Sequence, residues 1–187
     1  MRHGLFSVLL LLVASVAQGG QARDAEPGAC IAYGDDWAFM IVPPPGWSLV
    51  CHVEDTLGVT VALWPSDSSW KDATAVMYVN PSGRSDPKES LQAFVNDEIG
   101  RFRKDNPGLK VENAEGLKTG DAAPILVRKL TGDRFGNHEA IAYVESKRIF
   151  AILVLTARSE AAFNSSFAAF ERLVGSYRYM DKVNGEK

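Results

Sequence analysis

The chain has 187 residues, of which 46% are hydrophobic, 10% aromatic and 23% charged. This composition is typical of a globular protein and excludes disordered, collagen-like and coiled-coil chains. The 20 Lys and Arg residues against 23 Asp and Glu give a formal net charge of −3. Because neither sign accumulates in a long block, we expect no nucleic-acid partner.

The first 22 residues have the pattern of a secretory signal peptide. Met1-Arg2-His3 precedes an apolar run from Leu5 to Val16, and small residues offer cleavage sites between positions 17 and 22. The run is shorter than the roughly 20 residues that a membrane-spanning helix needs, so a permanent anchor is the weaker interpretation. No later segment resembles a membrane span. We therefore predict a periplasmic or secreted protein.

The rest of the chain divides into a polar leader at 23–36, one domain at 37–180 and a polar tail at 181–187. Only two cysteines are present, Cys30 and Cys51. An oxidising compartment and the lack of any other thiol favour a disulfide between them, and two free buried thiols are the alternative. Lipid attachment at Cys30 is disfavoured because no aliphatic residue stands three positions before it.

The first half of the predicted domain is rich in strands. Residues 37–42 form a strand that stops at Pro43-Pro44-Pro45-Gly46, since proline cannot donate to a β-ladder. Extended structure resumes at 47–53. Two further segments, 59–64 and 73–79, are rich in β-branched and aromatic residues and are bounded by turn residues. We predict four strands here.

The first predicted helix follows these strands. Asp86 is a candidate N-cap, Pro87 suits the first helical position, and Glu89 can reach back to the cap amide. Apolar residues then recur at three- and four-residue steps as far as Phe102, and Asn106-Pro107-Gly108 ends the pattern. The periodicity predicts a helix with one buried face.

The second half of the domain returns to strands and ends in a helix. The segment 109–131 is strand-like but broken near Gly116, and 139–144 with 149–156 predict an antiparallel hairpin. The second arm is continuously apolar, which predicts a central strand covered on both faces. Ser159 then caps a helix whose aromatic stripe faces the sheet. The order predicts a single α+β domain, with two principal helices on one antiparallel-rich twisted sheet.

Several short motifs in this order resemble the PsbP-like (Mog/PsbP) family. They are a strand running into Pro44-Pro45-Gly46-Trp47, a helix opening Ser85-Asp86-Pro87, a late apolar strand followed by Ser159-Glu160, and an aromatic helix closing in Ser176-Tyr177-Arg178. The resemblance spans about residues 37–179. It implies an α/β/α sandwich and a small binding or assembly module without catalysis.

No catalytic or cofactor motif accompanies this resemblance. After the predicted cleavage only His52 and His138 remain, and neither belongs to a zinc-binding or phosphate-binding pattern. We predict no catalytic residue, no metal and no cofactor. The alternatives are a hydrolase, which needs one of these histidines in a cleft beside a nucleophile and a carboxylate, and a carrier, which needs an enclosed apolar pocket.

The candidate partner contact is the loop between Trp64 and Trp70. Two large aromatic residues flank the polar stretch 65–69, and aromatic residues are enriched in binding hot spots. In the alternative interpretation both indoles cap the core, which suits Trp64 better because it continues a strand. The sequence thus favours an exported, non-enzymatic module that binds an unidentified protein partner through Trp70.

Overall fold

The structure is a computed structural model that describes residues 28–84, 86 and 88–180. The predicted signal peptide and the predicted C-terminal tail lie outside these residues. In chain order the described elements are β1 (Cys30–Tyr33), β2 (Ala38–Ile41), β3 (Trp47–Val53), α1 (Glu54–Leu57), β4 (Val59–Pro65), β5 (Ala75–Gly83), α2 (Leu91–Asp105), β6 (Lys110–Ala114), β7 (Ile125–Thr131), β8 (His138–Glu145), β9 (Ile149–Ala157), α3 (Glu160–Ser176) and β10 (Arg178–Met180).

Seven strands form the main sheet, in the order β3-β4-β5-β9-β8-β7-β6. Every neighbouring pair is antiparallel. The apolar strand β9 lies at the centre of this order, as its sequence predicts, and most of its residues are buried. The antiparallel hairpin of β8 and β9 is also confirmed.

A second sheet corrects the prediction of a single sheet. Strands β1 and β10 pair with opposite sides of β2, so the order is β1-β2-β10. Strand β1 lies inside the segment predicted to be a polar leader, where Cys30 and Ala32 are buried. The structured region therefore begins before the predicted boundary at Trp37. With only four residues, and with polar residues on both sides, β1 is too short for its sequence to indicate a strand.

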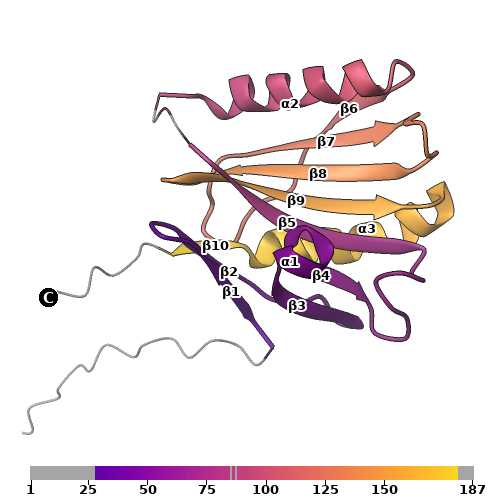
Figure 1. The fold of residues 1–187 in the computed structure, drawn as a ribbon, viewed down its shortest axis with the longest axis horizontal. Helices are drawn as coiled ribbons and strands as arrows, with labels where there is room; N and C mark the ends of the chain where they lie inside the picture. The colour runs from indigo at the N-terminus through magenta and orange to yellow at the C-terminus, as the bar shows by residue number, and fades with distance from the viewer. Residues whose placement is uncertain (1–27, 85, 87, 181–187) are drawn as a thin grey trace, which may run out of the picture.

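The two sides of the main sheet are covered differently (Figure 1). On one side α2 lies over β7 and β8, where Phe94 stacks on Phe150 with ring centroids 4.4 Å apart. On the other side α3 and the small sheet close the larger core, which contains Phe39 and Tyr177. The layers are thus helix, sheet, and helix with small sheet, an α+β fold of the predicted class.

The predicted N-cap is correct for one of the two long helices and wrong for the other. The N-cap of α3 is Ser159, as predicted, and its Oγ accepts a hydrogen bond from the Ala162 amide at 3.2 Å. The predicted Asp86 cap of α2 is wrong, because Ser90 caps that helix. Asp86 instead accepts a hydrogen bond from the Lys88 amide at 2.8 Å in a turn of its own.

The Cys30–Cys51 disulfide joins the two sheets. It links β1 to the edge strand β3, with the two Cα atoms 6.1 Å apart and 21 residues of separation along the chain. Both cysteines are thereby paired, and no free cysteine is left among the described residues. The bond holds the N-terminal strand against the main sheet.

Arg84 joins three segments at the opposite end of β5. Its guanidinium donates to the Ser146 carbonyl at 3.0 Å and to the Glu89 carbonyl at 2.8 Å, and it lies 3.1 Å from a Glu145 carboxylate oxygen. The guanidinium also lies over the Phe150 ring, 4.9 Å from its centroid. Because only 10% of the Arg84 side chain is exposed, these contacts are formed largely away from water.

Candidate functional site

The structure brings together the two tryptophans that the sequence analysis singles out. Trp64 lies near the end of β4, and Trp70 follows in the connection to β5. Their ring centroids are 6.4 Å apart and the planes are inclined by 75°, a favourable edge-to-face geometry. Both residues are half-buried, so neither interpretation of the pair, core cap or exposed anchor, describes it fully.

Hydrogen bonds hold the loop that carries Trp70. The Ser69 hydroxyl donates to the Asp72 carboxylate at 2.7 Å, and the Asp72 amide donates back to Ser69 Oγ at 3.2 Å. Arg158, at the end of β9, donates to the Lys71 carbonyl at 2.9 Å. The indole of Trp70 is therefore presented by a loop with a defined backbone.

A small cleft opens beside Trp70. Its volume is about 160 Å³, and its lining includes Val76, Asn137, Thr156 and Arg158. Val76 and Thr156 are opposite one another in the β5–β9 register. Side chains of a strand alternate between faces, so these residues and Trp64 belong to the side of the main sheet that α2 only partly covers.

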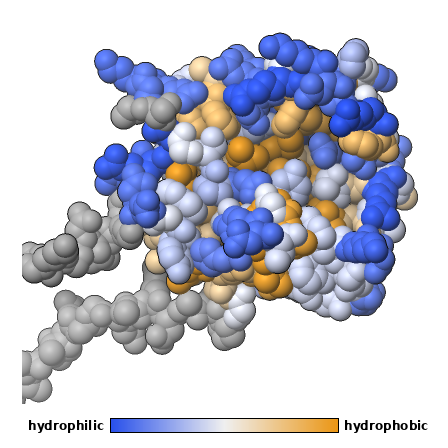
Figure 2. Space-filling view, in the orientation of Figure 1, coloured by the Kyte–Doolittle hydropathy of each residue, from blue (hydrophilic) through white to orange (hydrophobic). Residues whose placement is uncertain are grey.

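That side of the sheet forms a surface that we call the open face. It comprises half-buried or exposed residues of β3, β4, β5 and β9 beside α2, namely Val50, Trp64, Val76, Tyr78 and Ile152. Figure 2 shows this side of the molecule hollowed below α2, with hydrophobic residues in the hollow and hydrophilic residues around it. The alternation of side chains along the strands indicates in the sequence which residues share this face. It does not indicate that α2 covers only part of the face.

Burial perturbs two titratable groups on this side of the main sheet, Tyr78 of the open face and Glu139 of the neighbouring strand β8. Burial raises the pKa of Tyr78 to about 12, and the negative charge of Glu139 adds to the rise. Burial also raises the pKa of the Glu139 carboxyl, and the charge of Asp133 acts in the same direction, whereas a hydrogen bond with the Thr156 side chain lowers it. Burial thus disfavours the negatively charged form of both side chains.

The two histidines lie apart. His52 is exposed, its Nε2 is 3.3 Å from the Ile31 carbonyl oxygen, and its ring contacts Tyr33. His138 lines a cleft of about 330 Å³ whose lining also includes Glu112, Thr131 and Glu160. The lining of this cleft includes no serine or cysteine, and both cysteines are in the disulfide. Thr131 is the hydroxyl-bearing residue of this lining.

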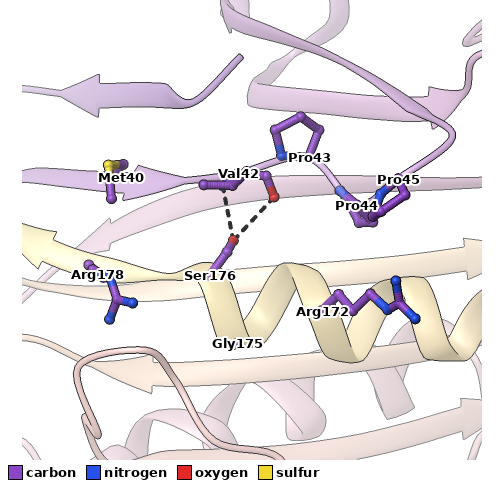
Figure 3. Close-up of a pocket in the computed structure, with 9 residues that line it drawn as sticks. All are labelled: Met40, Val42, Pro43, Pro44, Pro45, Arg172, Gly175, Ser176 and Arg178. Atoms are coloured by element: carbon purple, nitrogen blue, oxygen red, sulfur yellow. Dashed lines mark hydrogen bonds between the residues drawn. The ribbon is translucent and has the colours of Figure 1, made fainter. Parts of the chain in front are cut away.

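Another cleft lies where the small sheet meets the end of α3 (Figure 3). It has a volume of about 300 Å³, with Pro43, Pro44 and Pro45 on one wall and Arg172 and Arg178 on the other. In Figure 3 the two guanidinium groups point apart, and Arg178 donates to the Gly120 carbonyl. The two arginines therefore do not form a single clamp for an anion.

Ser176 uses its hydroxyl to join α3 to β2 in this cleft. The Ser176 Oγ accepts from the Val42 amide at 3.0 Å and lies 2.7 Å from the Leu173 carbonyl, to which it can donate. Val42 immediately follows β2. The hydroxyl is thus part of the attachment of the small sheet to the main core.

We expect Ser176→Ala to lower the free energy of unfolding by about 1 kcal/mol, because the half-buried Val42 amide loses its acceptor. Urea denaturation would measure the change. The control is Ser165→Ala, since that exposed hydroxyl donates only to Ala162 in its own helix, and it should change stability by less than about 0.5 kcal/mol. Equal effects of the two substitutions would contradict the proposed attachment.

The described clefts do not include an enclosed apolar cavity. Each of the five has at least one charged residue in its lining, so the carrier alternative has no supporting pocket among them. Within the described ranges no cluster of three or more His, Cys, Asp or Glu side chains could hold a metal ion. No described helix is long and apolar enough to cross a membrane.

Comparison with known proteins identifies the fold. No protein-family model and no curated protein sequence matches the chain. Among solved structures, cyanobacterial PsbP from Synechocystis aligns with a TM-score of 0.51 and 14% identity, over 88% of this chain and 99% of that one. A protein of unknown function from Pseudomonas aeruginosa aligns with a TM-score of 0.42 and 15% identity, over 75% of this chain and 81% of that one. A Bacteroides thetaiotaomicron protein aligns with a TM-score of 0.43 and 12% identity, over 80% of this chain and 47% of that one. The alignment with cyanobacterial PsbP shows that the fold is PsbP-like.

Proposed function

We propose that this protein is an exported, non-catalytic module that binds a protein partner, with Trp70 and Trp64 as the anchor of the contact. The observation that carries the proposal is the edge-to-face indole pair at the border of the open face. Aromatic side chains offer a large contact area with few rotatable bonds, which is why they dominate binding hot spots. The apolar residues of the open face extend the surface beside the pair.

Export is supported by two independent features of the chain. The sequence begins with a positive segment and an apolar run of signal-peptide type. The Cys30–Cys51 disulfide suits an oxidising compartment such as the periplasm or the extracellular medium. A PsbP-like fold is compatible with a binding role, although a fold alone does not specify a function.

We expect Trp70→Ala to weaken capture of the partner by more than about 1 kcal/mol, the usual threshold for a hot-spot residue, and to leave the thermal unfolding midpoint nearly unchanged. Capture is measured by crosslinking the protein in its native envelope, recovering it, and titrating the recovered partner against each variant. The matched control is Phe135→Ala, because Phe135 is an aromatic residue with 72% exposure in another loop.

Two outcomes would reject the role of Trp70. The first is a large loss of the unfolding midpoint with capture by the folded molecules intact, which would assign Trp70 to the core. The second is an equal loss of capture in the Phe135 control, which would mean that any exposed aromatic side chain contributes as much. A result with no crosslinked protein in the wild type would reject the binding function itself.

A further inference from the structure

Figure 1 shows α2 beside β6 and β7. A polar cleft lined by residues of these three elements lies on the side of α2 away from the open face. It consists of two adjoining cavities of about 410 and 320 Å³ that share Gln92, Asn113 and Arg128. The helix also contributes Asn96, Gly100 and Arg103. This cleft is separate from the Trp70 loop and from the cleft of Figure 3.

The cleft gathers positive charge and amide groups. Arg103 and Arg128 both line the larger cavity, whereas Glu115 is the acidic residue in the lining of the smaller one. Arg128 is half-buried, and one of its guanidinium nitrogens donates to the Val127 carbonyl at 3.0 Å. Two guanidinium groups in a protein of net charge −3 create a local preference for an anion.

The amide groups of α2 are oriented by a hydrogen bond between them. Gln92 Nε2 donates to Asn96 Oδ1 at 2.8 Å. This bond directs the Gln92 carbonyl oxygen and the Asn96 amide nitrogen to other partners, so the pair offers one acceptor and one donor. Asn113 adds a third amide from β6. Such groups recognise hydroxyl groups as well as charged oxygens.

Gly100 is an exposed residue of α2 in the lining of the larger cavity. It lies inside the helix α2, where glycine is less stable than alanine by roughly 1 kcal/mol. A Cβ atom at this position would meet no other atom within 4 Å, so the packing of the fold does not require glycine. The absence of a side chain leaves the helix surface open at the larger cavity, and a larger side chain here would reduce that space.

We propose that this cleft binds a small hydroxylated organic anion, of the sugar acid or sugar phosphate class. Arg103 and Arg128 hold the carboxylate or phosphate, since guanidinium groups match the geometry of these oxyanions. Gln92, Asn96 and Asn113 hydrogen-bond to the hydroxyl groups, and Gly100 allows the ring to approach the helix. The binding is non-covalent and needs no cofactor.

Isothermal titration of the whole protein with glucuronate, glucose 6-phosphate, glucose and inorganic phosphate tests this assignment. We expect saturable binding of at least one of the two anionic sugars, at least about tenfold tighter than glucose and than inorganic phosphate. Arg128→Gln should weaken that binding by about tenfold or more. Gly100→Leu should abolish it without lowering the thermal unfolding midpoint, because leucine is a good helix former.

The matched control is Arg172→Gln, which removes a guanidinium from the cleft of Figure 3 and should leave the affinity unchanged. The assignment is overturned if neither anionic sugar binds below about 10 mM. It is also overturned if inorganic phosphate binds as tightly as the sugars, or if Gly100→Leu retains full affinity. Partner capture through Trp70 is measured separately, so either proposal can fail without the other.

Discussion

Replacing Arg84 by methionine is expected to lower the free energy of unfolding by about 3 kcal/mol, although methionine keeps much of the aliphatic packing on Phe150. The substitution leaves the Ser146 and Glu89 carbonyl oxygens without their donor. It also leaves the Glu145 carboxylate without its positive partner. Because 29% of the Glu145 side chain is exposed, water relieves part of this loss, and we place the expected effect at the lower end of the range for buried ion pairs.

Guanidinium denaturation at neutral pH, followed by tryptophan fluorescence and far-ultraviolet circular dichroism, measures this effect. The matched control is Arg148→Met, since Arg148 pairs with Asp36 at 3.8 Å and both side chains are more than half exposed. That pair should contribute less than about 1 kcal/mol. If the two substitutions destabilise equally, Arg84 contributes as a surface charge and not as a junction of three segments.

Removing the disulfide by changing Cys30 and Cys51 together to alanine should cost roughly 3 kcal/mol. The bond closes a loop with 21 residues of separation. In the chain-entropy model this closure lowers the entropy of the unfolded chain and thereby stabilises the folded state by roughly 3 kcal/mol. The loss of the cysteine side chain of the buried residue Cys30 adds to it. We expect β1 to lose protection first, because the bond is its covalent attachment to the main sheet.

Amide hydrogen exchange resolved by mass spectrometry, together with urea denaturation, would measure both effects. Wild-type protein treated with a reductant serves as the control and should resemble the double variant. Retention of wild-type stability and of wild-type protection in β1 by the double variant would contradict this account. Loss of protection throughout the main sheet at the same rate would show that the small sheet does not unfold separately.

The local parts of the fold are the ones that the sequence predicts. The continuous apolar run of β9 indicates a central strand because every residue of such a strand is covered on one face or the other. Ser159 is a correct cap because a serine directly before an apolar periodic segment satisfies the first amides of the helix. These signals lie within a few residues of the structure that they specify.

The prediction for α2 fails because two nearby polar residues, Asp86 and Ser90, are both possible caps and the structure uses the second. Asp86 and Glu89 have the spacing of a capping box, yet the Glu89 carbonyl accepts from Arg84 and Ser90 becomes the cap. The second sheet, in contrast, is non-local, since β10 pairs with β2 across most of the chain. The two candidate sites differ in this respect. Trp64, near the end of β4, contacts Trp70 only six residues later, whereas Arg103 and Arg128 line the same cavity only because α2 packs on the sheet.

The pairing of β10 with β2 has a consequence for the order in which the protein can be completed during synthesis. Strand β2 is made early, but one side of it receives hydrogen bonds from residues at the end of the fold, Arg178–Met180. Until these residues emerge from the ribosome, that edge of β2 is open to pairing with other chains. The domain therefore reaches its native state only after its last strand is available, and a nascent chain needs protection until then.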